Sequence, residues 1–133
     1  MIDGKALPLP DKSAAAPSAA HFGGAMNGTA SQVERAERIK REVNDEFDRL
    51  AAAFRWYARR QEDARRADTE AVLVILEEKR AEVMGRQEAA YFIHDWQEIS
   101  DQVRQMIFHD ARYLVIKVNR EERRRWSAER RRC

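Results

Sequence analysis

The 133-residue chain is poor in the residues that form turns and cross-links. It has five glycines, three prolines and one cysteine, and Gly85 is the only glycine or proline after residue 30. Strands and hairpins need turn residues at short intervals, so this shortage argues against a β-rich fold. The single Cys133 excludes a disulfide within the chain. No apolar run approaches the roughly 18 residues that span a bilayer.

Residues 1–30 also lack periodicity and any continuous apolar stretch typical of a secretory signal. They are rich in Ala, Pro, Gly and Ser, and we predict that they form a disordered tail. The absence of a signal and of a disulfide framework predicts a cytoplasmic protein without membrane contact.

The rest of the chain, residues 31–133, is highly charged and has helical periodicity. Charged residues make up 36% of the whole sequence and hydrophobic residues 44%. The patterns predict one helical domain with helices over about 31–66, 69–84, 86–118 and 120–132. The predicted fold class is therefore all-α, with long amphipathic helices in a hairpin or bundle behind the N-terminal tail.

The first predicted helix has a start signal and a long apolar stripe. Ser31 and Glu34 have the spacing of a capping box. The stripe runs at steps of three and four through Val33, Ala36, Ile39, Val43, Phe47, Leu50, Phe54 and Tyr57. This spacing is nearly heptad and fits a coiled-coil seam. Residues 59–70 have only alanines as apolar positions, and they form either a solvated bridge or the connection between two packed helices.

Two apolar segments follow. "AVLVIL", residues 71–76, is apolar on every side, which indicates burial in a bundle or an oligomer. "YLVIKV", residues 113–118, is β-branched and fits either a strand or a helix. We favour the helix because a lone strand has no evident partner. Asn119 and Glu122 predict that a new helix begins there.

Large apolar side chains on these helices are the predicted interface. One chain with a thirty-residue tail has few residues to cover such wide stripes, and dimerisation is the common solution. We therefore expect a homo-oligomer. The candidate interface residues are Phe47, Leu50, Phe54, Trp56, Leu73, Leu76, Trp96 and Trp126.

The charge distribution offers a second hypothesis, nucleic-acid binding. Residues 67–110 carry a net charge of −6 and residues 111–133 one of +6. The end of the chain, "NREERRRWSAERRRC", contains seven arginines and one tryptophan, a combination that suits phosphate contact and base stacking. Its three glutamates blunt this field, and a solvated or protein-docking helix is favoured. The candidate contacts are Arg55, Arg59, Arg60, Arg65, Arg66, Arg123, Arg124, Arg125, Arg130 and Arg131.

Acidic pairs offer a third, distant hypothesis. "EEKRAE", residues 77–82, and "EISD", residues 98–101, are similar to the paired acidic motifs of MazG-type all-α nucleotide pyrophosphohydrolases, although the first element has one residue too many. The resemblance implies Mg²⁺ held by Glu78, Glu82, Glu98 and Asp101. A solvated acidic face is the favoured interpretation. Two His–Asp pairs, at 94–95 and 109–110, lie about 22 Å apart on a continuous helix and cannot share one ion.

"RAEVMGRQEAAYFI", residues 80–93, has the Ala-x-x-x-Gly spacing of a helix-turn-helix, but His94 falls where an apolar residue is needed. No phosphate loop, zinc-ligand set or nucleophile triad is present. The sequence therefore predicts no catalytic residue, metal or cofactor. The leading hypothesis is a non-enzymatic helical interaction or assembly protein, with a composition that suggests a bacterial or phage accessory factor.

Overall fold

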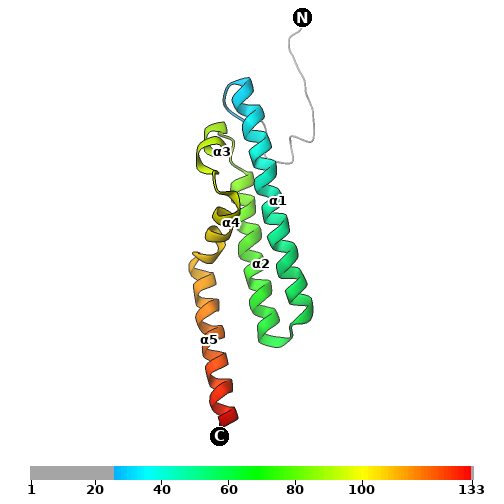
Figure 1. Cartoon of the computed structure of the whole chain (residues 1–133), viewed down its shortest axis with the longest axis vertical. Coiled ribbons are helices and arrows are strands. Elements are labelled where there is room, and N and C mark those ends of the chain that lie inside the picture. Colours follow the sequence, from blue (N-terminus) through cyan, green and yellow to red (C-terminus); the bar gives the residue numbers. More distant parts are fainter. Residues whose placement is uncertain (1–25, 133) are drawn as a thin grey trace, which may run out of the picture. The chain divides into compact units, whose positions relative to one another are not determined.

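A computed structural model describes residues 26–132, and in this range the chain is all-α (Figure 1). The described helices are α1 (Ala30–Arg60), α2 (Asp63–Met84), α3 (Ala89–Asp95), α4 (Ile99–Phe108) and α5 (Ala111–Arg132). This confirms the predicted fold class. Of the predicted tail, residues 1–25 lie outside the described residues. None of the helices described here is long and apolar enough to cross a membrane.

The described residues form two compact units. The first contains residues 26–42 and Ala81–Gln97, and the second contains Val43–Arg80 and residues 98–132. Helices α1 and α2 are each divided between the two units, at residues 42–43 and 80–81. Helix α3 belongs to the first unit, and α4 and α5 belong to the second.

A capping box in the first unit starts α1, two residues before the predicted one. The hydroxyl of Thr29 accepts a hydrogen bond from the Gln32 amide at 3.2 Å, and the Gln32 side chain accepts one from the Thr29 amide at 2.9 Å. Helix α1 therefore begins at Ala30, and Ser31 lies in its first turn. The Ser31–Glu34 assignment was wrong because Thr29 and Gln32 have the same chemistry at the same spacing.

The segment before this cap is tied to the start of α3. The Asn27 amide donates to the Gln87 carbonyl at 2.7 Å, and the Ala89 amide donates to the Asn27 carbonyl at 3.0 Å. Gly28 follows at a φ of +150°, and a Cβ there would meet the Ala89 side chain at 3.1 Å. This position needs glycine both for its backbone angle and for its space. Residues 26–30, predicted as part of the tail, are thus ordered by backbone hydrogen bonds.

The core of the first unit combines aromatic residues with a buried lysine. Phe92 and Trp96 are buried, and Tyr91 packs edge-on to both rings, with centroids 4.9 and 6.4 Å away. Lys40 is 4% exposed; its ammonium lies 5.5 Å from the centre of the Phe92 ring and 3.5 Å from the Arg86 carbonyl. Burial lowers the pKa of Lys40, and the neighbouring Glu37 carboxylate partly offsets this effect.

The second unit contains the helical hairpin of α1 and α2. Arg80 of α2 donates to Asp48 of α1 at 2.5 Å, and Arg55 of α1 donates to Glu77 of α2 at 3.3 Å. The two chain directions are antiparallel, as Figure 1 shows. The largest fully buried side chains of this unit come from α1, α2 and α4: Val43, Phe47, Val72, Ile75, Leu76, Val103 and Ile107.

The buried face of α1 has the predicted period but a different centre. Its buried residues are Ala36, Lys40, Val43, Glu46, Phe47, Ala51 and Ala58. Leu50 and Phe54 are half-buried at the edge of this face, and Tyr57 is 53% exposed. Small alanines therefore occupy buried positions while larger neighbours pack beside them. The predicted stripe contained the large residues Leu50, Phe54 and Tyr57 and did not include Ala51 and Ala58.

The predicted bounds of the first two helices were wrong at the turn of the hairpin. The first helix ends at Arg60 and not near residue 66, because Asp63 adopts a φ of +53° and reverses the chain without glycine. Thr69 supports this turn by donating to the Gln61 side chain at 2.5 Å. The connection between the packed helices is thus residues 61–62, and the second helix begins at Asp63 and not at residue 69.

The predicted helix over 86–118 is three helices. It breaks at residues 96–98 and again at residues 109–110. The second break arises because the Asp110 carboxylate accepts a hydrogen bond from the Arg112 amide at 2.8 Å and so caps α5. Helix α5 then runs without interruption through Asn119, where a new start was predicted. The choice of helix for "YLVIKV" is confirmed.

Candidate functional site

Helix α5 differs from the rest of the described chain because none of its residues is buried. It nevertheless carries four exposed apolar side chains, namely Leu114, Val115, Val118 and Trp126, with exposed fractions of 47 to 62%. A 22-residue helix normally gains its stability by burying an apolar face. Among the described residues α5 completes no such face, although Tyr113 and Ile116 are half-buried.

Ion pairs hold α5 beside α2 within the second unit. The Asp110 carboxylate lies 3.2 Å from the Lys79 ammonium, and Arg112 donates to Glu78 at 2.8 Å. Near the other end of α5, Arg123 pairs with Asp68. Residue numbers rise along α5 as they fall along α2, so the two helices are antiparallel.

Asp110 is the most strongly perturbed acid in this arrangement. Its carboxylate receives hydrogen bonds from the side chain and backbone of Arg112, and it also faces Lys79. These contacts, with the Arg112 guanidinium first, hold the pKa of Asp110 well below its usual range. The same carboxylate raises the pKa of Arg112 above its ordinary value. Asp110 therefore caps α5 and anchors it to α2.

The face of α5 away from α2 is apolar over its first two turns. Arg112, Arg123 and Arg120 point to α2, as their ion pairs with Glu78 and Asp68 require. At 100° per residue, one group of side chains falls on the opposite side of the helix. We call this group the outer face, and it consists of Ala111, Leu114, Val115 and Val118. All four are exposed.

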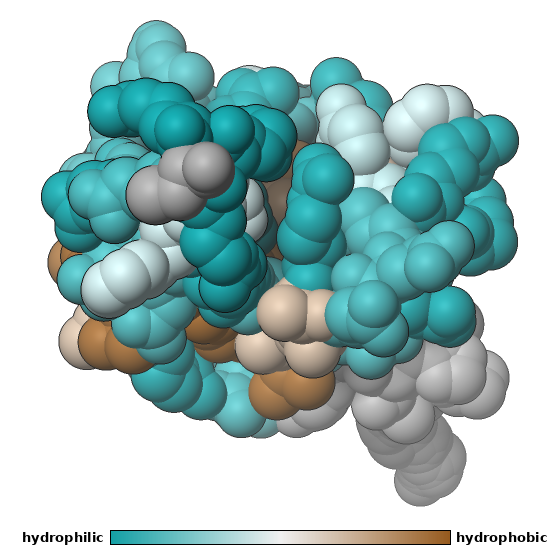
Figure 2. All heavy atoms as spheres, turned by 90° about the horizontal axis from the view of Figure 1, so that it is seen from below, coloured by the Kyte–Doolittle hydropathy of each residue, from teal (hydrophilic) through white to brown (hydrophobic). Residues whose placement is uncertain are grey.

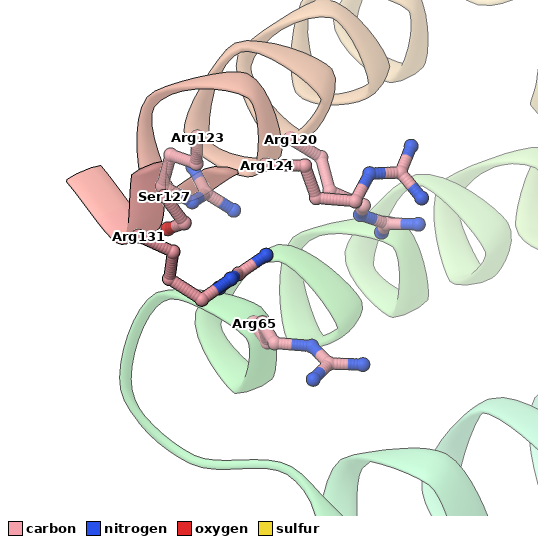
Figure 3. A pocket seen from close by; sticks show the side chains of 6 residues that line it. All are labelled: Arg65, Arg120, Arg123, Arg124, Ser127 and Arg131. Atoms are coloured by element: carbon pink, nitrogen blue, oxygen red, sulfur yellow. The ribbon is translucent and has the colours of Figure 1, made fainter. Parts of the chain in front are cut away.

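A pocket of about 460 Å³ lies between the end of α5 and the start of α2 (Figure 3). Five arginines and one serine line it: Arg65, Arg120, Arg123, Arg124, Ser127 and Arg131. Figure 3 shows the Arg65 side chain extending from α2 and the others from α5. We call this the arginine pocket. Hydrophilic side chains predominate on the surface at this end of the molecule (Figure 2).

One carboxylate, that of Asp68, balances the arginine pocket. It pairs with Arg123 and lies 3.9 Å from the Arg120 guanidinium. Arg65, Arg124 and Arg131 form no ion pair with any residue that the structure describes. Three of the five guanidinium groups thus lack a counter-charge among the described residues.

The predicted interface residues fall into three groups. Phe47, Leu76 and Trp96 are buried in the cores of their units and stabilise the fold. Leu50, Phe54 and Leu73 are half-buried. Trp56 and Trp126 are exposed, at 45% and 62%. Of the eight, only Trp126 presents most of its side chain to a partner, because Trp56 also stacks under the Arg60 guanidinium.

The predicted nucleic-acid contacts also separate. Arg65, Arg123, Arg124 and Arg131 meet in the arginine pocket. Three others form ion pairs elsewhere: Arg55 with Glu77, Arg66 with Glu70 and Arg125 with Glu122. The Arg60 guanidinium lies over the Trp56 ring, 3.7 Å from its centre. Arg59 and Arg130 are exposed. The sequence argument omitted Arg120 and Ser127, although their spacing from Arg123, Arg124 and Arg131 places them on the same side of a helix.

The acidic residues of the hydrolase hypothesis are engaged or exposed. Glu78 pairs with Arg112, and Asp101 lies 3.9 Å from Arg104. Glu82 and Glu98 are exposed. Within residues 26–132, no three His, Cys, Asp or Glu side chains come together as metal ligands. No protein-family model, curated protein or solved structure matches the chain.

Proposed function

We propose that this protein is a non-enzymatic helical interaction module that assembles through the outer face of α5. The observation that carries the proposal is the absence of any buried residue in α5, although Leu114, Val115 and Val118 form an apolar surface on it. Apolar side chains grouped on one face of an exposed helix are typical of protein–protein contact sites.

A second copy of the chain is the proposed occupant. Two identical apolar faces are complementary under a two-fold axis, which is the commonest symmetry of soluble oligomers. An antiparallel pairing centred between Val115 and Val118 brings the two outer faces together. It also directs the arginine-rich ends, residues 120–132, away from each other, whereas a parallel pairing would place these like charges side by side.

Light scattering at micromolar concentration tests the proposal. We expect the parent protein to be a dimer or larger, and Leu114→Gln with Val118→Gln to shift it to a monomer. The matched control is Lys117→Arg with Asn119→Gln, which changes two exposed residues of the same turns on either side of the outer face and leaves the net charge unchanged. A monomeric parent, or equal loss of assembly in both double variants, would overturn the proposal.

A further inference from the structure

We infer that the arginine pocket is a binding site for adjacent phosphate groups, such as those of a nucleic-acid strand or of a free polyphosphate. This function goes beyond the proposed assembly through the outer face and uses a different part of α5. The inference starts from the clustering of Arg65 with four arginines that follow it by more than fifty residues in the sequence.

The charge in the arginine pocket is not balanced from within. Five guanidinium groups line it, and Asp68 is the one carboxylate that pairs with any of them among the described residues. Guanidinium groups with no counter-charge repel one another, and an anion between them removes this repulsion. The pocket therefore favours a ligand with more than one negative charge.

The chemistry of the lining selects phosphate. Arginine presents a planar fork of N–H donors that matches two oxygens of a phosphate group, and Ser127 adds a hydroxyl donor. The lining contains no aromatic or aliphatic side chain of the kind that anchors a protein partner. It also contains no aromatic ring on which a base would stack, so contact with the phosphates dominates.

The start of α2 reinforces this selection. Arg65 lies in the first turn of α2, where the helix dipole attracts anions. The other four arginines of the pocket lie along α5. From Arg120 to Arg131 the helix rises about 16 Å, which is long enough for more than one phosphate group.

Asp68 has the role of an internal competitor. Its carboxylate holds Arg120 and Arg123 when the pocket is empty of ligand, and its charge repels an incoming phosphate. An asparagine at this position keeps an oxygen acceptor for the arginines and removes the charge. We therefore expect Asp68→Asn to raise phosphate affinity several-fold. Partial unfolding of the variant would lower the affinity, so a gain cannot come from damage to the structure.

The main test compares two triple variants that remove the same charge. The pocket variant combines Arg65→Gln, Arg124→Gln and Arg131→Gln. It replaces the three arginines of the pocket that form no ion pair with the described residues. The control, Arg66→Gln, Arg125→Gln and Arg130→Gln, changes the immediate neighbour of each in the sequence, and all six side chains are exposed. Binding of inorganic tripolyphosphate and of a labelled single-stranded oligonucleotide is measured by calorimetry and fluorescence anisotropy at low salt. Melting temperatures verify that each variant folds.

We expect the pocket variant to lose affinity at least tenfold and the control to stay within about twofold of the parent. The oligonucleotide affinity of the pocket variant should also depend less on salt. Three lost phosphate contacts should reduce the slope of log K against log[salt] by about 2. Tighter binding of the oligonucleotide assigns the pocket to a nucleic-acid strand, and tighter binding of tripolyphosphate assigns it to a free polyphosphate.

Three results would overturn the inference: no binding by the parent, equal losses in both triple variants, or equally tight binding of poly-glutamate at the same charge. The L114Q/V118Q variant separates this inference from the proposed assembly. Its arginine pocket is intact, so it should bind phosphate even where it no longer self-associates.

Discussion

Helices α2 and α5 have the same length, 22 residues, and opposite relations to the core. Helix α2 buries Val72, Ile75 and Leu76 against its neighbours, whereas α5 buries nothing. Both contain a short β-branched apolar run, "AVLVIL" and "YLVIKV". Apolar content alone therefore does not decide whether a helix enters the core.

The difference lies in what faces each helix. In the second unit α2 packs in the hairpin, where α1 offers Phe47 and Ala51 as buried partners. Helix α5 meets α2 through charged side chains, and an exposed ion pair such as Arg112–Glu78 contributes little stability. Helix α2 thus maintains the fold, and α5 presents two surfaces, the outer face and the arginine pocket.

The largest effect should come from breaking the hairpin core. Phe47 is fully buried, and Arg80 of α2 lies 6.0 Å from the centre of its ring. We expect Phe47→Ala to lower the free energy of unfolding by about 3–5 kcal/mol, because a buried aromatic is lost and a cavity remains. Chemical denaturation measures this change. A loss below about 0.5 kcal/mol, the range of surface substitutions, would contradict the burial of this face.

A smaller effect is expected at the junction of α2 and α5. The folded pKa of Asp110 lies below its ordinary value, so its stabilisation is present above the unfolded pKa and is lost as the pH falls below about 4. Asp110→Asn should abolish this acid-dependent part while keeping a capping oxygen. Asp110→Ala should lower the melting temperature further because it also removes the cap.

Thermal melts of the three proteins between pH 2 and 7 provide the measurement. The parent's melting temperature should approach that of Asp110→Asn as the acid limit is reached. Parallel pH profiles for the parent and Asp110→Asn would contradict the assigned ion pairs.

Lys40 should produce a small effect in the alkaline range. Burial lowers its folded pKa below the ordinary value of 10.5. As the pH rises from the folded pKa toward 10.5, the unfolded chain binds more protons than the folded one, so the free energy of unfolding rises. Lys40→Met has no proton to release and should lack this rise. The difference between the two proteins in denaturation at pH 8 to 11 isolates the lysine, and an identical slope would contradict its burial.

The smallest effect on stability is expected for a substitution on the exposed outer face of α5. Val118→Ala on α5 should change the free energy of unfolding by less than about 0.5 kcal/mol at protein concentrations below the range of self-association. Denaturation midpoints measured beside those of Phe47→Ala provide the check. A loss above about 1 kcal/mol would place Val118 in a core.

Local sequence patterns predicted much of the fold. The lack of glycine and proline indicated helices, and the spacing of three and four residues identified the buried side of α1. The errors arose where two residues offered the same chemistry or where no signal stood out. Thr29 and Ser31 are equivalent capping residues, and Asp63 reverses the chain without the glycine that usually marks such a position.

The candidate sites were less predictable. Both arginine-rich segments, 55–66 and 120–132, were candidates, but the sequence did not indicate that Arg65 alone of the first segment would join the arginines of the second. Lys40 was not a candidate for burial because lysine is seldom buried, and its environment comes from Phe92 and the Arg86 carbonyl. Asp110 did carry a local signal, since an aspartate before an apolar run is a helix cap.

The sequence by itself determined that the chain is helical, where its apolar periodicity lies and that its end is rich in arginine, because these properties depend on residues three or four positions apart. Only the tertiary structure decided that α2 is covered and α5 is not, and that Arg65 joins four distant arginines around Asp68. Burial and the grouping of charges depend on which helix faces which, and that arrangement arises from contacts between residues far apart in the chain.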